Sequence, residues 1–207
     1  MVIALHGKMG SGKSTIANQL VAVLKDQYNV ESVIKSFAQP IYQLTSTIFD
    51  ESIDNIKKSK HTIFRPRNYS LRSYRELLQN IGMELRDIVG KDIWINALFG
   101  NENSKILHDW TGNGCRWWII DDLRFLNEYQ RIKSMGGKVF KIFRDTPDMH
   151  KEILNNVRNN RSELDLDAIP NDSWDLLIDN NNSLDFSKDI LEKYITTLLN
   201  SDTQDFL

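Results

Sequence analysis

The stretch Gly7-Lys8-Met9-Gly10-Ser11-Gly12-Lys13-Ser14 decides the fold of this 207-residue chain. It matches the phosphate-binding loop G-x-x-x-x-G-K-[S/T] at every position. An apolar segment, Val2–His6, precedes it, and Ser14–Asp26 follows with apolar residues at helical spacing. Glycines allow backbone N–H groups to turn towards phosphate oxygens, and the following helix adds the positive end of its dipole. We therefore predict a strand, a phosphate-binding loop and a helix, in this order.

Two side chains of this loop are suited to nucleotide chemistry. Lys13 would supply a positive charge to the β- and γ-phosphates of a nucleotide, and Ser14 would offer its hydroxyl to Mg²⁺. ATP and Mg²⁺ are accordingly the predicted cofactors. The predicted ATP-binding residues of the loop are Gly7, Met9, Gly10, Ser11, Gly12, Lys13, Ser14 and Thr15.

Strand-like and helix-like segments alternate along most of the chain. The predicted strands are Val2–His6, Ser32–Ala38, Arg116–Asp121, Lys138–Arg144 and Trp174–Asp179. The predicted helices are Ser14–Asp26, Phe125–Met135, Pro147–Asn159 and Leu184–Leu199. Such alternation is typical of α/β proteins, in which helices flank a parallel sheet of, here, about five strands. Ligands of these sheets bind beyond the carboxyl ends of the strands.

Composition and charge exclude several classes of protein. Apolar residues make up 41% and charged residues 26%, so a disordered or collagen-like chain is excluded. The net charge of −2 argues against stable, general nucleic-acid binding, which a basic excess would accompany. Cys115 is the single cysteine, so an internal disulfide is excluded. No apolar run approaches the roughly 20 residues of a membrane span, and we expect a soluble, cytoplasmic protein without membrane contact.

Carboxylates and an arginine follow the predicted third strand, in the segment Asp121-Asp122-Leu123-Arg124. A carboxylate at a strand end beside a phosphate-binding loop commonly holds the Mg²⁺ shell. The alternative is an ordinary surface turn. We favour Asp122 as a metal ligand together with Ser14, and Arg124 as a ligand-binding residue, whereas Asp121 is the weaker carboxylate candidate.

The region from Gln39 to Gly114 does not follow the alternation and is predicted to be a mostly helical insertion. Within it, 72–89 is predicted to form a helix with an apolar face made of Leu77, Leu78, Ile81, Leu85 and Ile88. The polar side of this helix carries Arg72, Arg75, Gln79 and Arg86. Such a stripe is often only a solvated face. Arginines can also grip a phosphate monoester, and a glutamine amide can pair with a base edge.

Several function classes remain open at this point. The chain lacks the Asn-Lys-x-Asp motif expected of a GTPase, and its compact length favours a small-molecule kinase. The acceptor could be a nucleotide, dephospho-coenzyme A or a sugar acid. A non-kinase alternative is a nucleotide-dependent switch or DNA-associated ATPase, and another is a binding module that has lost its chemistry.

Segments in matching order along nearly the whole chain resemble the deoxynucleoside monophosphate kinases of tailed bacteriophages. They are Gly7–Ser14, Ser36–Ile41, Arg75–Gly82, Asp92–Trp94, Asp122–Glu128, Ser162-Glu163 and Ile178–Asn181. The resemblance implies a P-loop nucleoside monophosphate kinase fold with one domain. Its parts would be a core (1–38, 115–143, 165–200), an acceptor-binding insertion (39–114) and a lid (144–164).

The resemblance also implies a reaction and a set of site residues. The reaction is transfer of the γ-phosphoryl group of ATP to a deoxynucleoside monophosphate, with the base preference and a homodimer left open. The implied acceptor-binding residues are Phe37, Arg72, Arg75, Gln79, Arg86, Trp94 and Arg124. Arg144 is a candidate for ATP binding, and the implied catalytic residues are Lys13, Asp122, Arg124, Arg158 and Arg161.

Overall fold

The computed structural model describes residues 1–60, 62, 73–100, 117–145 and 164–202. The chain divides into two compact units. The first unit consists of Met1–Lys35 and Leu107–Leu207, and the second of Ser36–Ile106. The predicted helix Pro147–Asn159 and the lid residues Arg158 and Arg161 lie outside the described residues, as does Arg72.

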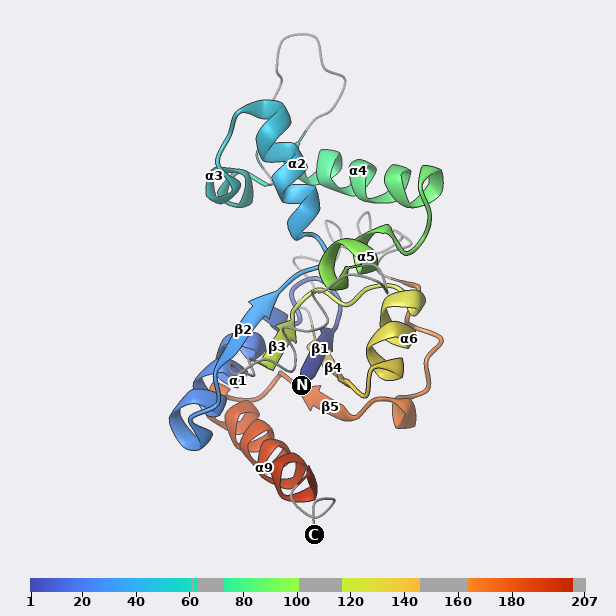
Figure 1. Cartoon of the computed structure of the whole chain (residues 1–207). Coiled ribbons are helices and arrows are strands. Elements are labelled where there is room, and N and C mark those ends of the chain that lie inside the picture. The colour runs from blue at the N-terminus through green and yellow to red at the C-terminus, as the bar shows by residue number, and fades with distance from the viewer. Residues whose placement is uncertain (61, 63–72, 101–116, 146–163, 203–207) are drawn as a thin grey trace. The chain divides into compact units, whose positions relative to one another are not determined.

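A five-stranded sheet forms the centre of the first unit (Figure 1). Its strands are β1 (Val2–His6), β2 (Ser32–Lys35), β3 (Trp117–Ile120), β4 (Lys138–Phe143) and β5 (Leu176–Asp179). Their order across the sheet is β2-β3-β1-β4-β5, and every neighbouring pair is parallel. The order reverses on either side of β1, so the loop after β1 lies at the edge where such sheets bind ligands. The predicted α/β fold is confirmed.

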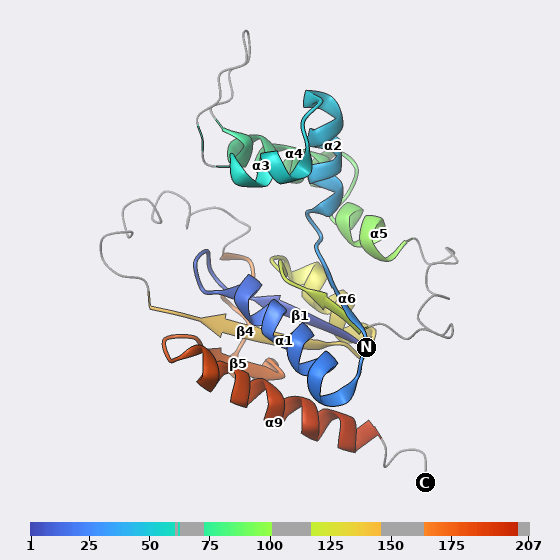
Figure 2. The same ribbon diagram turned by 90° about the vertical axis from the view of Figure 1, so that its left-hand side faces the viewer.

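Helices cover both faces of this sheet. Helices α1 (Lys13–Tyr28) and α9 (Leu184–Asp202) lie side by side against one face, and α6 (Leu126–Ser134) packs against the other (Figure 2). The main apolar core lies between the sheet and the α1–α9 pair, and its central side chains, such as Ile3, Leu20 and Phe140, are fully buried. Burial at about 25 cal/mol per Å² of apolar surface makes this layer the chief source of stability.

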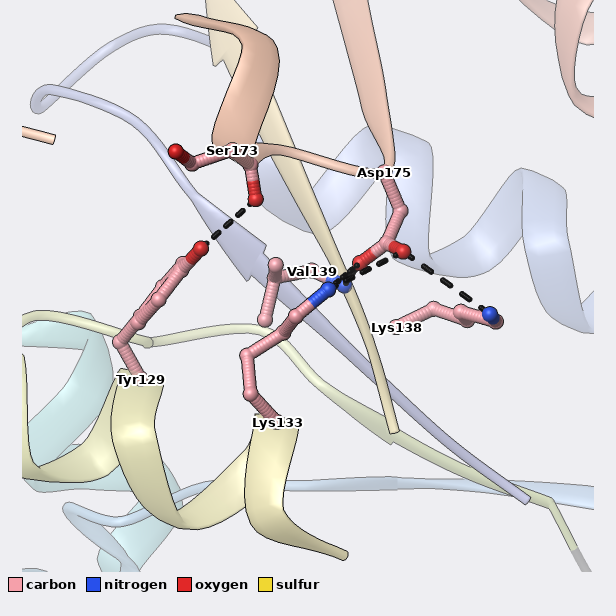
Figure 3. Close-up of polar contacts among 6 residues, drawn as sticks. All are labelled: Tyr129, Lys133, Lys138, Val139, Ser173 and Asp175. Atoms are coloured by element: carbon pink, nitrogen blue, oxygen red, sulfur yellow. Dashed lines mark hydrogen bonds and ion pairs between the residues drawn. The ribbon is translucent and has the colours of Figure 1, made fainter. Parts of the chain in front are cut away.

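The fifth strand begins later than the sequence pattern predicts, at Leu176 rather than Trp174. At the amino ends of β4 and β5, the Asp175 carboxylate accepts a hydrogen bond from the Val139 backbone N–H at 2.8 Å (Figure 3). The same carboxylate forms ion pairs with Lys133 at 3.0 Å and Lys138 at 3.9 Å. Asp175 therefore ties the start of β5 to β4 through its side chain and also through its backbone N–H, which donates to the Val139 carbonyl at 2.9 Å.

The second unit is helical. Its described helices are α2 (Gln39–Phe49), α3 (Ile53–Lys58), α4 (Tyr74–Ile88) and α5 (Ile93–Phe99). Two of these helices, α3 and α4, have a serine side chain as their N-terminal cap. The hydroxyl of Ser52 accepts from the Asn55 N–H, and that of Ser73 accepts from the Glu76 N–H. None of the described helices is both long and apolar enough to cross a membrane.

Helix α4 differs from its predicted pattern at two positions. Arg86 was expected on the polar side but is 8% exposed, and Ile88 was expected on the apolar face but is 76% exposed. The indole of Trp94 on α5 donates to the Gly82 carbonyl at 3.0 Å, and a Cβ on Gly82 would lie 3.2 Å from the Ile41 side chain of α2. Arg86 lies one helical turn after Gly82, on the side of α4 that Gly82 presents to α2, which accounts for its burial. Ile88 belongs to the last turn, beyond this contact.

Candidate functional site

The loop between β1 and α1 adopts a conformation that requires glycine at two positions. Gly10 has a φ of 84° and Gly12 a φ of 92°, both in the left-handed region that side chains disfavour. A hydrogen bond of 3.1 Å from the Ser11 N–H to the Lys8 carbonyl closes the turn. Glycine at positions 10 and 12 of the motif is therefore explained by the backbone conformation of the loop.

The first turn of α1 is open to an anion. Gly12 is its N-cap residue, no side chain caps the helix, and its first turn contains no acidic residue. Ser14 and Thr15 in this turn are exposed. The first N–H groups of a helix have no partner within the helix, and the dipole favours negative charge beside them. This end of α1 is therefore built to receive phosphate oxygens.

The Lys13 ammonium is held at the same loop. It donates to the carbonyl oxygens of Gly7 and Lys8, the latter at 3.0 Å. The backbone of Gly7 lies so close to β4 that a Cβ there would be 2.3 Å from the Ile142 carbonyl oxygen. The loop is thus packed against the sheet on one side and carries a positive charge bonded to its own carbonyls.

Asn180, which the sequence analysis did not select, contacts this loop. It follows β5 and its side chain donates to the Ser11 carbonyl at 2.8 Å, although 169 residues separate the two in sequence. Asn180 is 5% exposed. In the sequence it belongs to the segment Ile178–Asn181 of the family resemblance, and no local spacing connects it to the phosphate loop.

The loop after β3 carries Asp122 and Arg124 at the same edge of the sheet. Its backbone is fixed to β1, next to the phosphate loop, by a 3.2 Å hydrogen bond from the Leu123 N–H to the Leu5 carbonyl. Asp122 and Arg124 are both half-buried. Because β3 is adjacent to β1, the structure brings this loop and the phosphate loop to neighbouring strand ends.

Glu128, also missed by the sequence analysis as a single residue, holds this loop from α6. One oxygen of its carboxylate accepts from the N–H groups of Arg124 and Phe125 at 2.9 and 3.0 Å. Glu128 is 2% exposed. A glutamate three residues into a helix is a recognised capping feature, and this pattern could have identified it.

His6, the last residue of β1, is a buried support for the loop. Its Nδ1 lies 3.1 Å from the Leu123 carbonyl oxygen, and its ring stacks on Trp174 with the ring centres 5.2 Å apart. Burial lowers the pKa of His6 to about 4, and the charge of Lys13 acts in the same direction. The imidazole is therefore neutral at pH 7 and packed in the core.

The segment that begins at residue 164 is attached to the phosphate loop and to the start of α6. Asp167 forms an ion pair with Lys8 of the phosphate loop, and the carboxylate of Asp165 accepts from the Leu126 N–H at the start of α6 at 2.7 Å. Leu166, between them, is fully buried. Arg144, at the end of β4, is exposed.

The remaining predicted residues lie in the helical unit. Arg75 and Gln79 are half-buried on α4. Phe37 and Trp94 are buried, and Phe37 packs edge-on against Phe99 at a ring distance of 6.1 Å. The described contacts of these two aromatic residues are within the core of this unit, whereas Arg75 and Gln79 have partly accessible side chains.

The sheet unit offers residues of the chemical types that bind a nucleoside triphosphate and Mg²⁺. The uncapped first turn of α1 and the glycine conformations suit phosphate, and the Ser14 hydroxyl and the Asp122 carboxylate are oxygen donors of the kind that Mg²⁺ prefers. Mg²⁺ commonly keeps several water ligands and needs few from the protein.

Comparison with known proteins gives one similar curated sequence and several similar structures. No protein family model matches the chain. A protein of Acanthamoeba polyphaga mimivirus, named "Putative deoxynucleotide monophosphate kinase", is 27% identical over an alignment of 201 residues. The match covers 89% of this chain and 91% of that protein.

Similar solved structures include dephospho-CoA kinase from Campylobacter jejuni, with 16% identity and a TM-score of 0.45 over 97% of this chain and 98% of that one. Shikimate kinase from Bacteroides thetaiotaomicron has 12% identity and a TM-score of 0.43 over 95% and 98%.

Proposed function

We propose that this protein is a P-loop kinase that transfers the γ-phosphoryl group of ATP to a deoxynucleoside monophosphate, giving ADP and the deoxynucleoside diphosphate. The observation that carries the kinase chemistry is the complete phosphate-binding loop at the β1–α1 junction, with Lys13 bonded to it and the first turn of α1 uncapped. The name of the mimivirus relative supports a deoxynucleotide acceptor.

The transfer itself asks little covalent chemistry of the protein. An anionic phosphate oxygen of the acceptor attacks the γ-phosphorus, the bond from that phosphorus to the bridging β–γ oxygen breaks, and ADP leaves. Because the attacking oxygen is already ionised, no general base is needed. Catalysis then consists of alignment and charge neutralisation.

We assign the residues to these tasks as follows. The loop from Gly7 to Ser14 and the first turn of α1 hold the donor phosphates, and Lys13 neutralises charge on the transferred group. Ser14 and Asp122 would hold Mg²⁺, which neutralises phosphate charge when bound. Arg124 contributes a second positive charge at the carboxyl edge of the sheet.

Acceptor recognition is assigned to α4 of the helical unit. Arg75 is suited to the monophosphate, because a guanidinium forms paired hydrogen bonds with phosphate oxygens. Gln79, one turn further on the same side of the helix, can both donate to and accept from a base edge. Arg86 is a weaker assignment than the sequence pattern suggested, because the structure buries it.

The test is an acceptor screen. The protein is incubated with Mg·ATP and, in separate reactions, each common deoxynucleoside and ribonucleoside monophosphate, dephospho-coenzyme A and shikimate, and the products are separated by chromatography. We expect ADP and a nucleoside diphosphate to form in equal amounts with at least one deoxynucleoside monophosphate. Phosphorylation of another acceptor alone would contradict the proposed substrate, and ATP hydrolysis that DNA stimulates, without transfer, would contradict the kinase assignment.

Lys13→Ala is the matched inactive variant for this screen. Removing its charge should reduce transfer by about 100-fold or more, the usual effect of losing one group that stabilises transition-state charge. Circular dichroism and the thermal midpoint should stay close to those of the wild type. Transfer at the wild-type rate by Lys13→Ala would show that the phosphate loop is not the donor site.

A further inference from the structure

Asn180 is placed to act on the phosphate-binding loop from the far end of the sequence. It is the first residue after β5, and its backbone N–H donates to the Phe143 carbonyl at 2.9 Å, which continues the pairing of β5 with β4. Its side chain is 5% exposed. The backbone position of Asn180 is therefore set by strand pairing, independently of its side-chain contacts.

Both ends of the Asn180 side chain have partners. The amide nitrogen donates to the Ser11 carbonyl at 2.8 Å, and the amide oxygen accepts from the Ser187 hydroxyl on α9 at 3.3 Å. Ser187 is fully buried. Since an amide has one accepting and one donating end, the hydroxyl of Ser187 helps to hold the amide with its NH₂ group towards the loop.

The loop passes close to the Asn180 amide at Gly12, the residue after Ser11. A Cβ on Gly12 would lie 2.1 Å from the Asn180 amide nitrogen. Gly12 also has a φ of 92°. The absence of a side chain at Gly12 thus serves two purposes, since it allows the backbone conformation and leaves room for the amide.

Holding the Ser11 carbonyl also orients a donor of the loop. The peptide group is planar and trans, so the Ser11 C=O and the Gly12 N–H point in opposite directions. When Asn180 draws the carbonyl towards β5, the Gly12 N–H is turned to the other side of the peptide. Backbone N–H groups are what a loop of this sequence offers to phosphate.

We propose that Asn180 is a positioning residue for the donor nucleotide, which orients the Ser11–Gly12 peptide of the phosphate-binding loop and is itself oriented by Ser187. It acts through the loop and does not touch the transferred group. The effect of Asn180 on phosphoryl transfer rests on the proposed function. Its effect on the affinity for Mg·ATP requires only that the protein binds the nucleotide.

The test uses Asn180→Asp and Asn180→Ala, with Ser187→Ala as a milder variant that keeps the amide. Asn180→Asp keeps the shape but replaces the donor by a carboxylate that repels the Ser11 carbonyl and the nucleotide phosphates. The dissociation constant of Mg·ATP is measured by calorimetric titration well below the thermal midpoint of each variant. We expect it to rise about tenfold in Asn180→Ala, more in Asn180→Asp, and about threefold in Ser187→Ala, as for loss of one oriented hydrogen bond.

Asp175→Asn provides the matched control. Asp175 precedes β5 as Asn180 follows it, and its contacts with Val139, Lys133 and Lys138 lie at the amino ends of the strands (Figure 3). This end of the strand is about 17 Å from its carboxyl end at the rise of an extended chain. Asp175→Asn should lower the thermal midpoint and leave the dissociation constant of Mg·ATP unchanged.

The outcomes separate this inference from the proposed function. Weaker ATP binding in the Asn180 and Ser187 variants supports the inference even where the wild type phosphorylates no monophosphate, which would overturn only the proposed acceptor. Lower thermal midpoints with wild-type ATP affinity in these variants would show that Asn180 is merely structural and would overturn the inference. If Asn180→Ala does not fold, the dissociation constants of Mg·ATP for Asn180→Asp and Ser187→Ala test the inference by the same criterion. A wild type that does not bind Mg·ATP would overturn both.

Discussion

At the scale of single residues, His6 shows how the fold turns an ionisable group into a neutral support. Burial lowers its pKa to about 4, with the charges of Lys13 and Lys141 acting in the same direction. The hydrogen bond with the Leu123 carbonyl and the charge of Asp167 act in the opposite direction but do not outweigh burial. Its place next to the phosphate loop is that of a packed side chain, with the ring stacked on Trp174 and Nδ1 facing the Leu123 carbonyl.

This lowered pKa predicts acid sensitivity. The unfolded chain binds a proton on His6 near its ordinary pKa of 6.5, whereas the folded chain binds it only near 4. The unfolded state therefore holds more protons between these values, and stability falls as the pH falls from 6.5 to 4. Between pH values well above 6.5 and well below 4, this shift lowers the free energy of unfolding by roughly 3 kcal/mol in total.

The measurement is urea unfolding of the wild type and His6→Gln at pH 7, 6, 5 and 4.5. The variant should be less stable at pH 7, because it loses the stacking on Trp174, but should lose less stability on acidification. Parallel pH profiles for the two proteins would refute the assignment of the acid sensitivity to His6.

At the scale of elements, the start of α6 is what holds the loop with Asp122 and Arg124 in place. The Glu128 carboxylate accepts from two backbone N–H groups of this loop and is 2% exposed. Hydrogen bonds to an ionised acceptor are stronger than neutral ones, and buried N–H groups without an acceptor are costly. Element and site are therefore coupled through one side chain.

Glu128→Ala tests this coupling. It should lower the free energy of unfolding by about 1–3 kcal/mol, since two N–H groups lose an acceptor. Phosphoryl transfer should also fall, because the loop after β3 loosens, and Glu128→Gln should recover part of both losses through its amide oxygen. Chemical unfolding and the transfer assay are the measurements.

Gln130→Ala, at an exposed position of the same helix, is the control and should change neither quantity. A Glu128→Ala protein as stable as Gln130→Ala would mean that the cap contributes nothing to stability.

At the scale of the whole molecule, the two units divide the proposed work. The sheet unit contains the phosphate-binding loop, and the helical unit contains Arg75 and Gln79 on α4. The net charge of −2 conceals this distribution, because a nearly neutral total is compatible with basic groups gathered at a few positions. Donor and acceptor affinities should accordingly respond to different substitutions.

Arg75→Ala is the prediction at this scale. It should raise the KM for the acceptor by about tenfold or more, the value of a charged hydrogen bond, and leave the KM for ATP unchanged. Steady-state kinetics with each substrate varied in turn gives both constants. Glu84→Ala, an exposed position about 180° around the helix from Arg75, should alter neither. An unchanged acceptor KM in Arg75→Ala would remove this residue from the acceptor site.

Much of the fold could be predicted because its evidence is local. Gly10 and Gly12 of the motif have the positive φ that favours glycine. The alternation of strands and helices predicts the parallel sheet, and β1 has its predicted bounds. Strand ends were less predictable. Trp174 belongs to a strand-like run in the sequence, but its ring stacks on His6 and the strand starts two residues later.

The candidate site can be proposed from the sequence to the extent that its residues lie in one motif. Lys13 and Ser14 follow from their spacing to the glycines, and Asp122 and Arg124 from their place after a strand. Helical periodicity alone places Arg86 on a polar face, whereas the packing of α2 against that side of α4 depends on the tertiary fold.

The sequence by itself determined the phosphate-binding loop and the α/β order of the elements, because both depend on neighbours within a few residues. Only the tertiary structure revealed that Asn180 bonds to Ser11 and that Asp175 ties β5 to β4. Hydrogen bonds between residues so far apart in the chain exist only after the sheet has brought β5 and β1 to either side of β4. No periodicity or local propensity specifies such pairs, since their geometry is a product of the packed fold.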